Sequence, residues 1–276
     1  MVIAEASIGE DGVMSEERLL PQGLGGSMVS VSGVGVHRTA GPWTPTVHAF
    51  LDHLHAAGFT AAPEVVGIDA EGREVLTFIE GEVLGDPLWR PGRPTPWPPN
   101  AQTEGALVTA GQLLGELHRA AASFVPADAI WKQYEWPGLV DGQIVCHGDI
   151  GPHNTVYRDG LPVAFIDWET IRPEQPLIEF GAALWHFVPL GSDDYFRISG
   201  FGATPPLAER LAAFAAAYGV TAPDDVLRAL HQSKQRSTER FRYYPIGPGE
   251  GAQGLRQVAD ALAWLDDRVE ALLAAL

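Results

Sequence analysis

The sequence predicts an α+β fold in which a small antiparallel sheet precedes a larger, mostly helical part. Short β-branched runs lie between residues 20 and 80, whereas the pattern after residue 100 is helical and rich in alanine. Residues 86–100 separate the two patterns and contain six prolines, which cannot donate a backbone hydrogen bond and so favour an extended connector. We therefore expect an N-terminal domain over residues 1–80 and a C-terminal domain over residues 81–276.

The N-terminal domain is expected to contain two hairpins and one helix. Four short runs have strand character, and they lie at residues 28–31, 34–37, 64–69 and 74–79. Ser32 and Gly33 separate the first two runs, as in a tight hairpin, and a turn at 70–73 separates the other two. Between the hairpins, Thr44 is expected to cap a helix over residues 45–56. The order predicts a small sheet with one helix packed against it.

Helices dominate the expected C-terminal domain. They are predicted at residues 103–121, 207–218, 224–241 and 255–275. In the first of these helices four leucines form one apolar stripe, namely Leu107, Leu113, Leu114 and Leu117. Three short strands are predicted between the first two helices, at residues 145–147, 155–157 and 162–166.

Composition narrows the classes of partner and compartment. The formal charge of 18 − 35 = −17 disfavours nucleic acid and anionic membranes and suits cationic ligands, although high acidity also serves solubility alone. A single cysteine, Cys146, cannot form an internal disulfide. No basic leader precedes an apolar run, and no stretch reaches the roughly 18 apolar residues of a spanning helix. We therefore expect a cytoplasmic protein with no membrane partner.

One segment carries an arrangement suited to phosphoryl transfer, and it covers residues 144–170. Asp149 follows a predicted strand, Asn154 comes five residues later, and Asp167 comes directly after a third strand. Such a reaction needs a carboxylate to orient the attacking hydroxyl and oxygen ligands to hold Mg²⁺. The alternative is structural: an ordinary Asx turn at Asp149 and Asn154, with Asp167 capping a neighbouring element. The spacing of the three residues taken together favours the phosphotransferase interpretation over the structural one.

These residues resemble the aminoglycoside phosphotransferase family, small-molecule kinases of the bilobal protein-kinase-like fold, whose pattern is H-G-D-x-x-x-x-N followed by I-D-W-E or I-D-W-D. The resemblance implies Asp149 as catalytic base, Asn154 and Asp167 as magnesium ligands, and His147 as a brace for the catalytic loop. Residues 114–118 and 176–185 also resemble family segments. The resemblance implies ATP as donor, with GTP left open, and a small nucleotide-binding lobe before a larger lobe for catalysis and substrate.

In the nucleotide-binding lobe the resemblance implies a phosphate loop and a phosphate-binding cation. Gly25, Gly26 and Ser27 would form the loop, although the same glycines also suit a flexible turn. Arg38, or its neighbour His37, would be the cation, and Arg38 equally suits a solvated hairpin end. Adenine would dock against the backbone of four consecutive residues, Thr77, Phe78, Ile79 and Glu80.

One position departs from the family pattern. The helix that should supply a glutamate to orient the phosphate-binding cation offers Thr46, Val47 and His48, none of which is a carboxylate. This departure calls into question how the cation is held. Farther on, Glu169 is expected to be a neighbour of the metal ligands or a solvated side chain.

Two functional hypotheses follow. The first is an enzyme that moves the γ-phosphate of ATP to a hydroxyl of a small molecule, with an aminoglycoside-like antibiotic, a sugar or an amino alcohol as acceptor and antibiotic resistance as its setting. A cationic acceptor suits the net charge of −17. The second is a catalytically silent kinase-like module that provides immunity or resistance by binding its ligand. The basic run at residues 232–244 suits a solvated helix face, an anionic group of the acceptor or contact with RNA, and the net charge disfavours the last of these.

Overall fold

The structure, a computed structural model, describes residues 17–19, 28–84, 96–133, 138–191, 193–202, 205–243 and 250–275. The predicted phosphate loop at Gly25, Gly26 and Ser27 lies outside these residues, as does most of the proline-rich connector. Contacts divide the chain into two compact units. The first contains Met1–Leu88, Leu117–Arg158 and Val163–Pro173, and the second contains the remaining residues. The division at residue 80 into a nucleotide-binding and a catalytic lobe is a functional one, and it stays a prediction.

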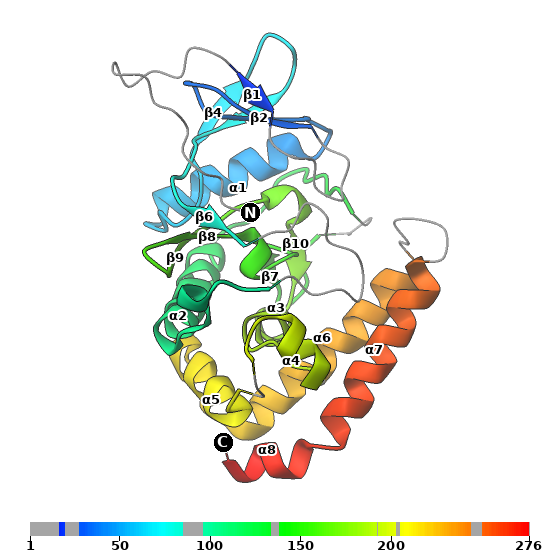
Figure 1. Cartoon of the computed structure of the whole chain (residues 1–276). Coiled ribbons are helices and arrows are strands. Elements are labelled where there is room, and N and C mark those ends of the chain that lie inside the picture. The colour runs from blue at the N-terminus through cyan, green and yellow to red at the C-terminus, as the bar shows by residue number, and fades with distance from the viewer. Residues whose placement is uncertain are drawn as a thin grey trace. The chain divides into compact units, whose positions relative to one another are not determined.

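The first unit contains a five-stranded antiparallel sheet with the order β1-β2-β3-β5-β4 (Figure 1). Its strands are β1 (Arg18–Leu19), β2 (Val29–Val31), β3 (Val36–Arg38), β4 (Val65–Ile68) and β5 (Glu74–Leu76). Ser32 and Gly35 exchange backbone hydrogen bonds of 2.9 and 3.2 Å, which closes the turn between β2 and β3. Both predicted hairpins are therefore confirmed, and the short β1 is an addition to them.

Helix α1 (Thr44–Ala56) packs against this sheet, below it in the view of Figure 1. Phe50, Leu51 and Leu54 are fully buried and form the apolar side of the helix. The predicted cap at Thr44 is wrong, because the helix begins one residue earlier than expected and Trp43 takes the capping position. The Thr44 hydroxyl instead accepts a hydrogen bond from the Gly41 N–H at 2.9 Å.

A second group of short strands holds the loops of the candidate site. A two-stranded sheet pairs β7 (Ile144–Cys146) with β10 (Arg172–Glu174). A three-stranded sheet has the order β6 (Glu82–Val83), β8 (Thr155–Arg158) and β9 (Leu161–Phe165). Two single-turn 3₁₀ helices lie in the loops of the candidate site, at Pro152–Asn154 and Trp168–Thr170. The three strands predicted here are confirmed, and β6 and β10 are additional.

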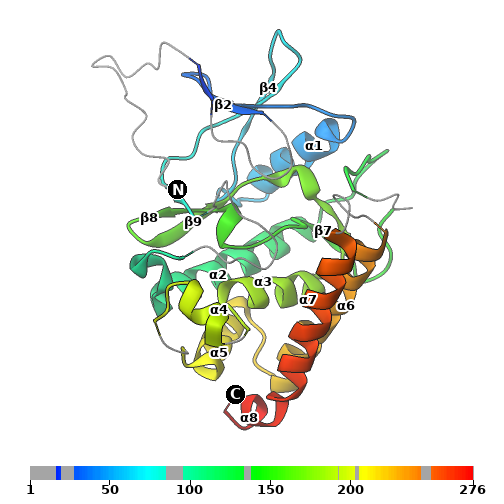
Figure 2. The same cartoon turned by 45° about the vertical axis from the view of Figure 1, so that its right-hand side comes forward.

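Helices make up most of the rest of the chain. They are α2 (Glu104–Ala121), α3 (Pro176–Phe187), α4 (Asp193–Ile198), α5 (Leu207–Tyr218), α6 (Pro223–Tyr243), α7 (Glu250–Asp266) and α8 (Val269–Ala275), after a 3₁₀ turn at Pro99–Gln102. In the second unit α6 and α7 lie side by side (Figures 1 and 2). The predicted helix over 255–275 is in fact two helices, and α3 and α4 are additional. Within the described residues, no helix combines the length and apolarity needed to cross a bilayer.

A close crossing of α3 and α6 explains one glycine of the second unit. A Cβ atom at Gly181 would lie 2.0 Å from the carbonyl oxygen of Ala229, so only glycine lets the two backbones approach this closely. Trp185, one turn further along α3, donates its indole N–H to the Leu230 carbonyl at 3.0 Å. These contacts fix the register of the two helices.

Candidate active site

The predicted catalytic loop folds around the side chain of Asn154. Its amide nitrogen donates to the Asp149 carbonyl at 2.8 Å and to the Asp149 carboxylate at 3.1 Å. Both partners can only accept hydrogen bonds, so the nitrogen must face Asp149 and the amide oxygen points elsewhere. The backbone carbonyl of Asn154 accepts a hydrogen bond from the Ile166 N–H at 2.9 Å. This bond brings Asn154 next to the residue that precedes Asp167.

Asp167 lies where β9 turns into the 3₁₀ helix that follows it. Its backbone is left-handed, with φ 70° and ψ 54°, a conformation that costs free energy for any residue except glycine. Strain of this kind is concentrated at functional sites. The side chain is 40% exposed and forms an ion pair with the Arg38 guanidinium. The carboxylate is therefore open to a ligand on one side and held by a cation on the other.

His147 connects the catalytic loop to the Asp167 segment. Its ring is fully buried, and Nε2 lies 2.9 Å from the Ile166 carbonyl, which can only accept, so Nε2 carries the proton. Nδ1 accepts the Asp149 N–H at 3.4 Å, and the ring packs on Trp168 with centroids 4.6 Å apart. The side chain thus contacts the residue before Asp167 and the backbone of Asp149 at once.

Three residues that were not predicted as site residues also join the catalytic loop to the segment that follows Asp167. Arg172 donates to the Gly148 carbonyl at 2.6 Å, and the Thr170 hydroxyl donates to the His147 carbonyl at 3.2 Å. Gly148 has φ +89°, and a Cβ there would lie 2.1 Å from the Thr170 carbonyl oxygen. The glycine between His147 and Asp149 was the available signal, since a glycine fixed inside a functional motif indicates close backbone approach.

The Arg38 guanidinium lies among three carboxylates. It pairs with Asp167, and its Nη2 is 3.5 Å from Glu169. The third is Glu74, the residue opposite Arg38 across the β3–β5 strand pair. Burial alone would lower the pKa of Arg38, but the charges of Asp167, Glu169 and Glu74 outweigh it and raise the pKa above its ordinary value. Arg38 is therefore a permanent cation in this cluster.

A lysine from the segment between α2 and β7 reaches the same cluster. Lys132 Nζ lies 2.5 Å from Glu169 and 5.1 Å from the ring centroid of Trp43. Two residues earlier, the Ile130 N–H donates to the Thr46 hydroxyl at 3.0 Å and ties the segment to α1. Lys132 thus shares Glu169 with Arg38, and nothing in the local sequence pattern indicated this.

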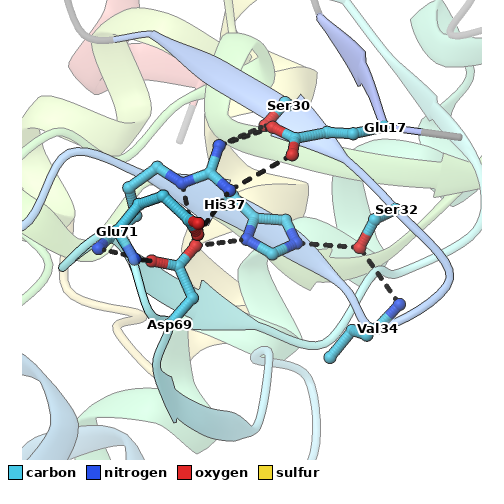
Figure 3. A network of polar contacts seen from close by, with 8 residues as sticks. Glu17, Ser30, Ser32, Val34, His37, Asp69 and Glu71 are labelled. Carbon is cyan, nitrogen blue, oxygen red and sulfur yellow. Dashed lines mark hydrogen bonds and ion pairs between the residues drawn. The ribbon is translucent and has the colours of Figure 1, made fainter.

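His37 belongs to a different part of the sheet. Consecutive residues of a strand point to opposite faces, so His37 and Arg38 do not share a site. His37 Nδ1 lies 2.8 Å from Asp69 and Nε2 lies 2.8 Å from the Ser32 hydroxyl (Figure 3). Arg73 extends this network by pairing with Asp69 and Glu17. The structure therefore joins the β2–β3 turn to the β4–β5 turn through His37, and it brings Arg38 alone to Asp167.

The four residues predicted to hold adenine directly follow β5, and their two ends are tied down. The Thr77 N–H donates to the Glu64 carbonyl at 2.9 Å, and the Thr77 hydroxyl accepts the Glu64 N–H at 2.8 Å. Arg158 donates to the Glu80 carbonyl at 3.0 Å. A cavity of about 280 Å³ includes Thr77 and Ile79 in its lining. Adenine contact with Phe78 and its neighbours stays a prediction.

The donor set fits a magnesium ion. Mg²⁺ prefers carboxylate and amide oxygens as ligands. The Asp167 carboxylate is half-exposed. The Asn154 amide nitrogen faces Asp149, so the amide oxygen of Asn154 is the available donor. Asp149, with its side chain 38% exposed, lies on the same loop. The structure thus brings together Asp149, Asn154, Asp167 and Arg38 of the predicted site, with His147 beneath them.

Comparison with known proteins gives the family. The sequence pattern of the phosphotransferase enzyme family (APH) matches residues 44–140 and 126–230. The chain is also similar to the trifolitoxin immunity protein of Rhizobium leguminosarum bv. trifolii, with 38% identity over 212 residues that cover 75% of this chain and 76% of the relative.

Solved structures show the same fold. Choline kinase from Cryptosporidium parvum matches with a TM-score of 0.56 and 11% identity over 99% of this chain and 96% of that one. Macrolide 2′-phosphotransferase from Brachybacterium faecium matches with a TM-score of 0.52 and 15% identity over 96% and 94%. These matches confirm the α+β protein-kinase-like fold with an antiparallel N-terminal sheet and a helical C-terminal part. The chain belongs to the APH family of phosphotransferases.

Proposed function

We propose that this protein transfers the γ-phosphate of ATP to a hydroxyl group of a small molecule. One observation carries the proposal: the loop from Asp149 to Asn154 is hydrogen-bonded to the Asp167 segment, and the Arg38 cation reaches the same carboxylate. Phosphoryl transfer depends on positioning and charge neutralisation, and this arrangement supplies a base, oxygen donors for metal and a cation within one unit.

Each residue has a role in the proposed reaction. The Asp149 carboxylate orients the acceptor hydroxyl and takes its proton as the new oxygen–phosphorus bond forms. The bond between the γ-phosphorus and the β–γ bridging oxygen breaks, and ADP leaves with that electron pair. Bound magnesium, held by Asn154 and Asp167, would neutralise phosphate charge. Arg38 would then turn from Asp167 to the phosphates, with His147 keeping the two loops in register.

The relatives support the donor and the kind of acceptor. Solved structures of aminoglycoside phosphotransferases include an ADP-bound form and a complex with streptomycin and ATP. We propose ATP with Mg²⁺ as the donor of this chain, and a cationic small molecule such as an aminoglycoside as a first acceptor to test, because the chain carries a net charge of −17. Cytoplasmic ATP makes the cytoplasm the proposed site of the reaction.

A second candidate is immunity by binding alone. Two observations favour it: the relative that is 38% identical is a trifolitoxin immunity protein, and α1 lacks the carboxylate expected near His48. Immunity through phosphorylation of a toxin agrees equally with the name of the relative. The two candidates differ in one measurable respect, because only the enzyme consumes ATP in proportion to modified acceptor.

The test is a mass-shift screen for one added phosphate across aminoglycosides, macrolides, nucleosides, amino alcohols and sugars, with Mg-ATP as donor. Asp149→Asn is expected to lower transfer about a thousandfold or more while ATP binding is retained, because the variant loses the base and keeps the metal donors. Asp141→Asn, an exposed loop carboxylate before β7, is the matched control and should behave like the parent. Equal turnover by the Asp149→Asn variant would contradict the proposal, and ligand binding without phosphate transfer would favour the binding module.

A further inference from the structure

We propose that Glu74 of β5 is the positioning residue for the Arg38 guanidinium, a task left open by α1, whose one carboxylate, Asp52, is exposed. The inference rests on the proposed function, because it assigns the residue that keeps the phosphate-binding cation in place during the reaction. In this proposal the carboxylate that holds Arg38 comes from strand β5. His48 occupies the region of α1 from which the family pattern supplies a glutamate.

The sheet register puts Glu74 beside Arg38. The two residues are directly opposite each other in the antiparallel pair of β3 and β5, so their side chains leave the same face of the sheet. Side chains in such a pair have Cβ atoms about 4.5–5.5 Å apart, which lets an opposite-charge pair interact. The sheet therefore fixes the distance between the Cβ atoms of Glu74 and Arg38 through the backbone.

Glu74 is also a buried charge that needs compensation. Only 5% of its surface is exposed, and a carboxylate removed from water is costly unless a cation faces it. Within the described part of the chain, the nitrogen within ion-pair distance of Glu74 belongs to His48, whose Nε2 lies 3.1 Å from Oε1 but out of line for a hydrogen bond. Arg38 is the permanent cation on the same face, and the charge of Glu74 acts on it through space.

The other two carboxylates near Arg38 have competing tasks. Asp167 is the proposed magnesium ligand, so a bound metal would compete with Arg38 for its carboxylate. Glu169 lies 2.5 Å from Lys132 and 3.5 Å from Arg38, so it is shared between two cations. Of these three carboxylates, Glu74 is the one held opposite Arg38 by the strand pairing, and it remains there whatever Asp167 binds.

The contact between His48 and Glu74 suggests a direct test by relocation. Because His48 Nε2 already lies 3.1 Å from the Glu74 carboxylate, a glutamate at position 48 would bring its charge to the same region from the helix side. If the function of Glu74 is to hold Arg38, moving the carboxylate from the strand to the helix should preserve that function. A purely structural role for Glu74 in the sheet predicts no such rescue.

The experiment compares the full-length parent with Glu74→Gln, with the relocated double variant His48→Glu/Glu74→Gln, and with Arg38→Ala alone and combined with Glu74→Gln. Glu71→Gln, an exposed glutamate in the same β4–β5 turn, is the matched control. Calorimetry gives the affinity for Mg-ATP and for adenosine, which lacks phosphates, and a melting curve reports folding. Phosphate transfer to an acceptor found in the screen gives kcat and KM.

We expect Glu74→Gln to weaken Mg-ATP binding about tenfold to a hundredfold, to leave adenosine binding near that of the parent, and to lower the melting temperature, because the buried Arg38 loses a facing charge. The relocated variant should recover most of the loss, and Glu74→Gln should add nothing in the Arg38→Ala background, because both changes act on one interaction. Glu71→Gln should match the parent.

Three results would overturn the inference: unchanged Mg-ATP affinity in Glu74→Gln, equal losses for ATP and adenosine, or additive losses with Arg38→Ala. Failure of the proposed function looks different. A parent that binds Mg-ATP but phosphorylates no acceptor contradicts that function, while the affinities still decide the role of Glu74. A parent that does not bind Mg-ATP overturns both.

Discussion

At the scale of single residues, one backbone hydrogen bond joins the two loops of the candidate site. The Ile166 N–H and the Asn154 carbonyl are 2.9 Å apart, and the two residues flank the loops that carry Asp149 and Asp167. His147 binds the carbonyl of the same Ile166 from below. The positions of the proposed base and metal donors are therefore set by one main-chain hydrogen bond together with buried or half-buried side chains that bind main-chain groups.

Gly148→Ala tests this close packing. The added Cβ would lie 2.1 Å from the Thr170 carbonyl oxygen, and the backbone at φ +89° disfavours any side chain. We expect a lower melting temperature and loss of most ATP-dependent transfer, because the Asp149 loop must move away from Thr170. Differential scanning calorimetry and the transfer assay measure the two effects.

Gly72→Ala is the control that separates the clash from the backbone strain. Gly72 also has a positive φ, +77°, but no atom lies within 4 Å of the position that a Cβ would take there. Alanine at this position therefore meets only the conformational cost, about 1 kcal/mol. Similar losses for the two variants would show that the close approach of Gly148 to the Thr170 carbonyl is unimportant for the site.

The sequence predicts some residues of the site better than others. The spacing of Asp149, Asn154 and Asp167 is local enough to read as one motif, and the structure brings the three residues together. Glu74 and Lys132 come from a distant strand and from an irregular segment, so no local spacing indicates their contacts with Arg38 and Glu169. For His37, the alternation of a strand already separates it from Arg38, and that signal was available in the sequence.

At the scale of elements, the sequence predicted the helices and strands that are marked by an apolar period or by turn residues. The two hairpins follow from alternating runs around short turns, and helix α2 follows from its apolar stripe. Thr103, predicted inside this helix, lies just before it, and its hydroxyl accepts the Ala106 N–H at 3.1 Å. Strand β6 has two residues and β10 has three, too few to show a period. Helix α3 is apolar almost all round, and a buried apolar run does not show by periodicity whether it is helix or strand.

Helix α6 carries a half-buried lysine, Lys234, whose charge has a measurable effect on stability. The Lys234 ammonium lies 4.4 Å from the ring centroid of Trp185, and burial lowers the pKa of Lys234 from 10.5 to about 8. The folded protein therefore loses this proton before the unfolded chain does. Stability contributed by this group rises with pH between about 8 and 10.5, and below pH 8 the folded state carries the full cost of the buried charge.

Lys234→Met should remove that cost while keeping a side chain that packs on Trp185. We expect a higher melting temperature at pH 7, by roughly 2–4 °C for each kcal/mol gained, and a smaller rise in stability between pH 8 and 10 than the parent shows. Arg228→Met, an exposed change on the same helix, should leave both quantities near the parent values. A Lys234→Met variant that is less stable at pH 7 would contradict the assignment of a costly buried ammonium.

At the scale of the whole molecule, family membership and net charge limit the function without fixing the acceptor. The protein-kinase-like fold serves choline kinase and macrolide phosphotransferase among the matched structures, so the fold alone does not identify a substrate. The charge of −17 favours a cationic acceptor through long-range attraction, an effect that weakens as salt is added.

We propose that Asn154 and Asp167 hold a magnesium ion beside ATP, and stabilisation of the folded protein by ATP with and without Mg²⁺ tests this proposal. At a ligand concentration of 100 times Kd, binding adds about 2.7 kcal/mol to the free energy of unfolding. We expect a clear rise in the melting temperature of the parent with Mg-ATP, a much smaller rise in EDTA, and no magnesium-dependent rise in Asp167→Asn, while the control Asp159→Asn follows the parent. An Asp167→Asn variant stabilised by Mg-ATP as strongly as the parent would show that Asp167 does not hold the metal.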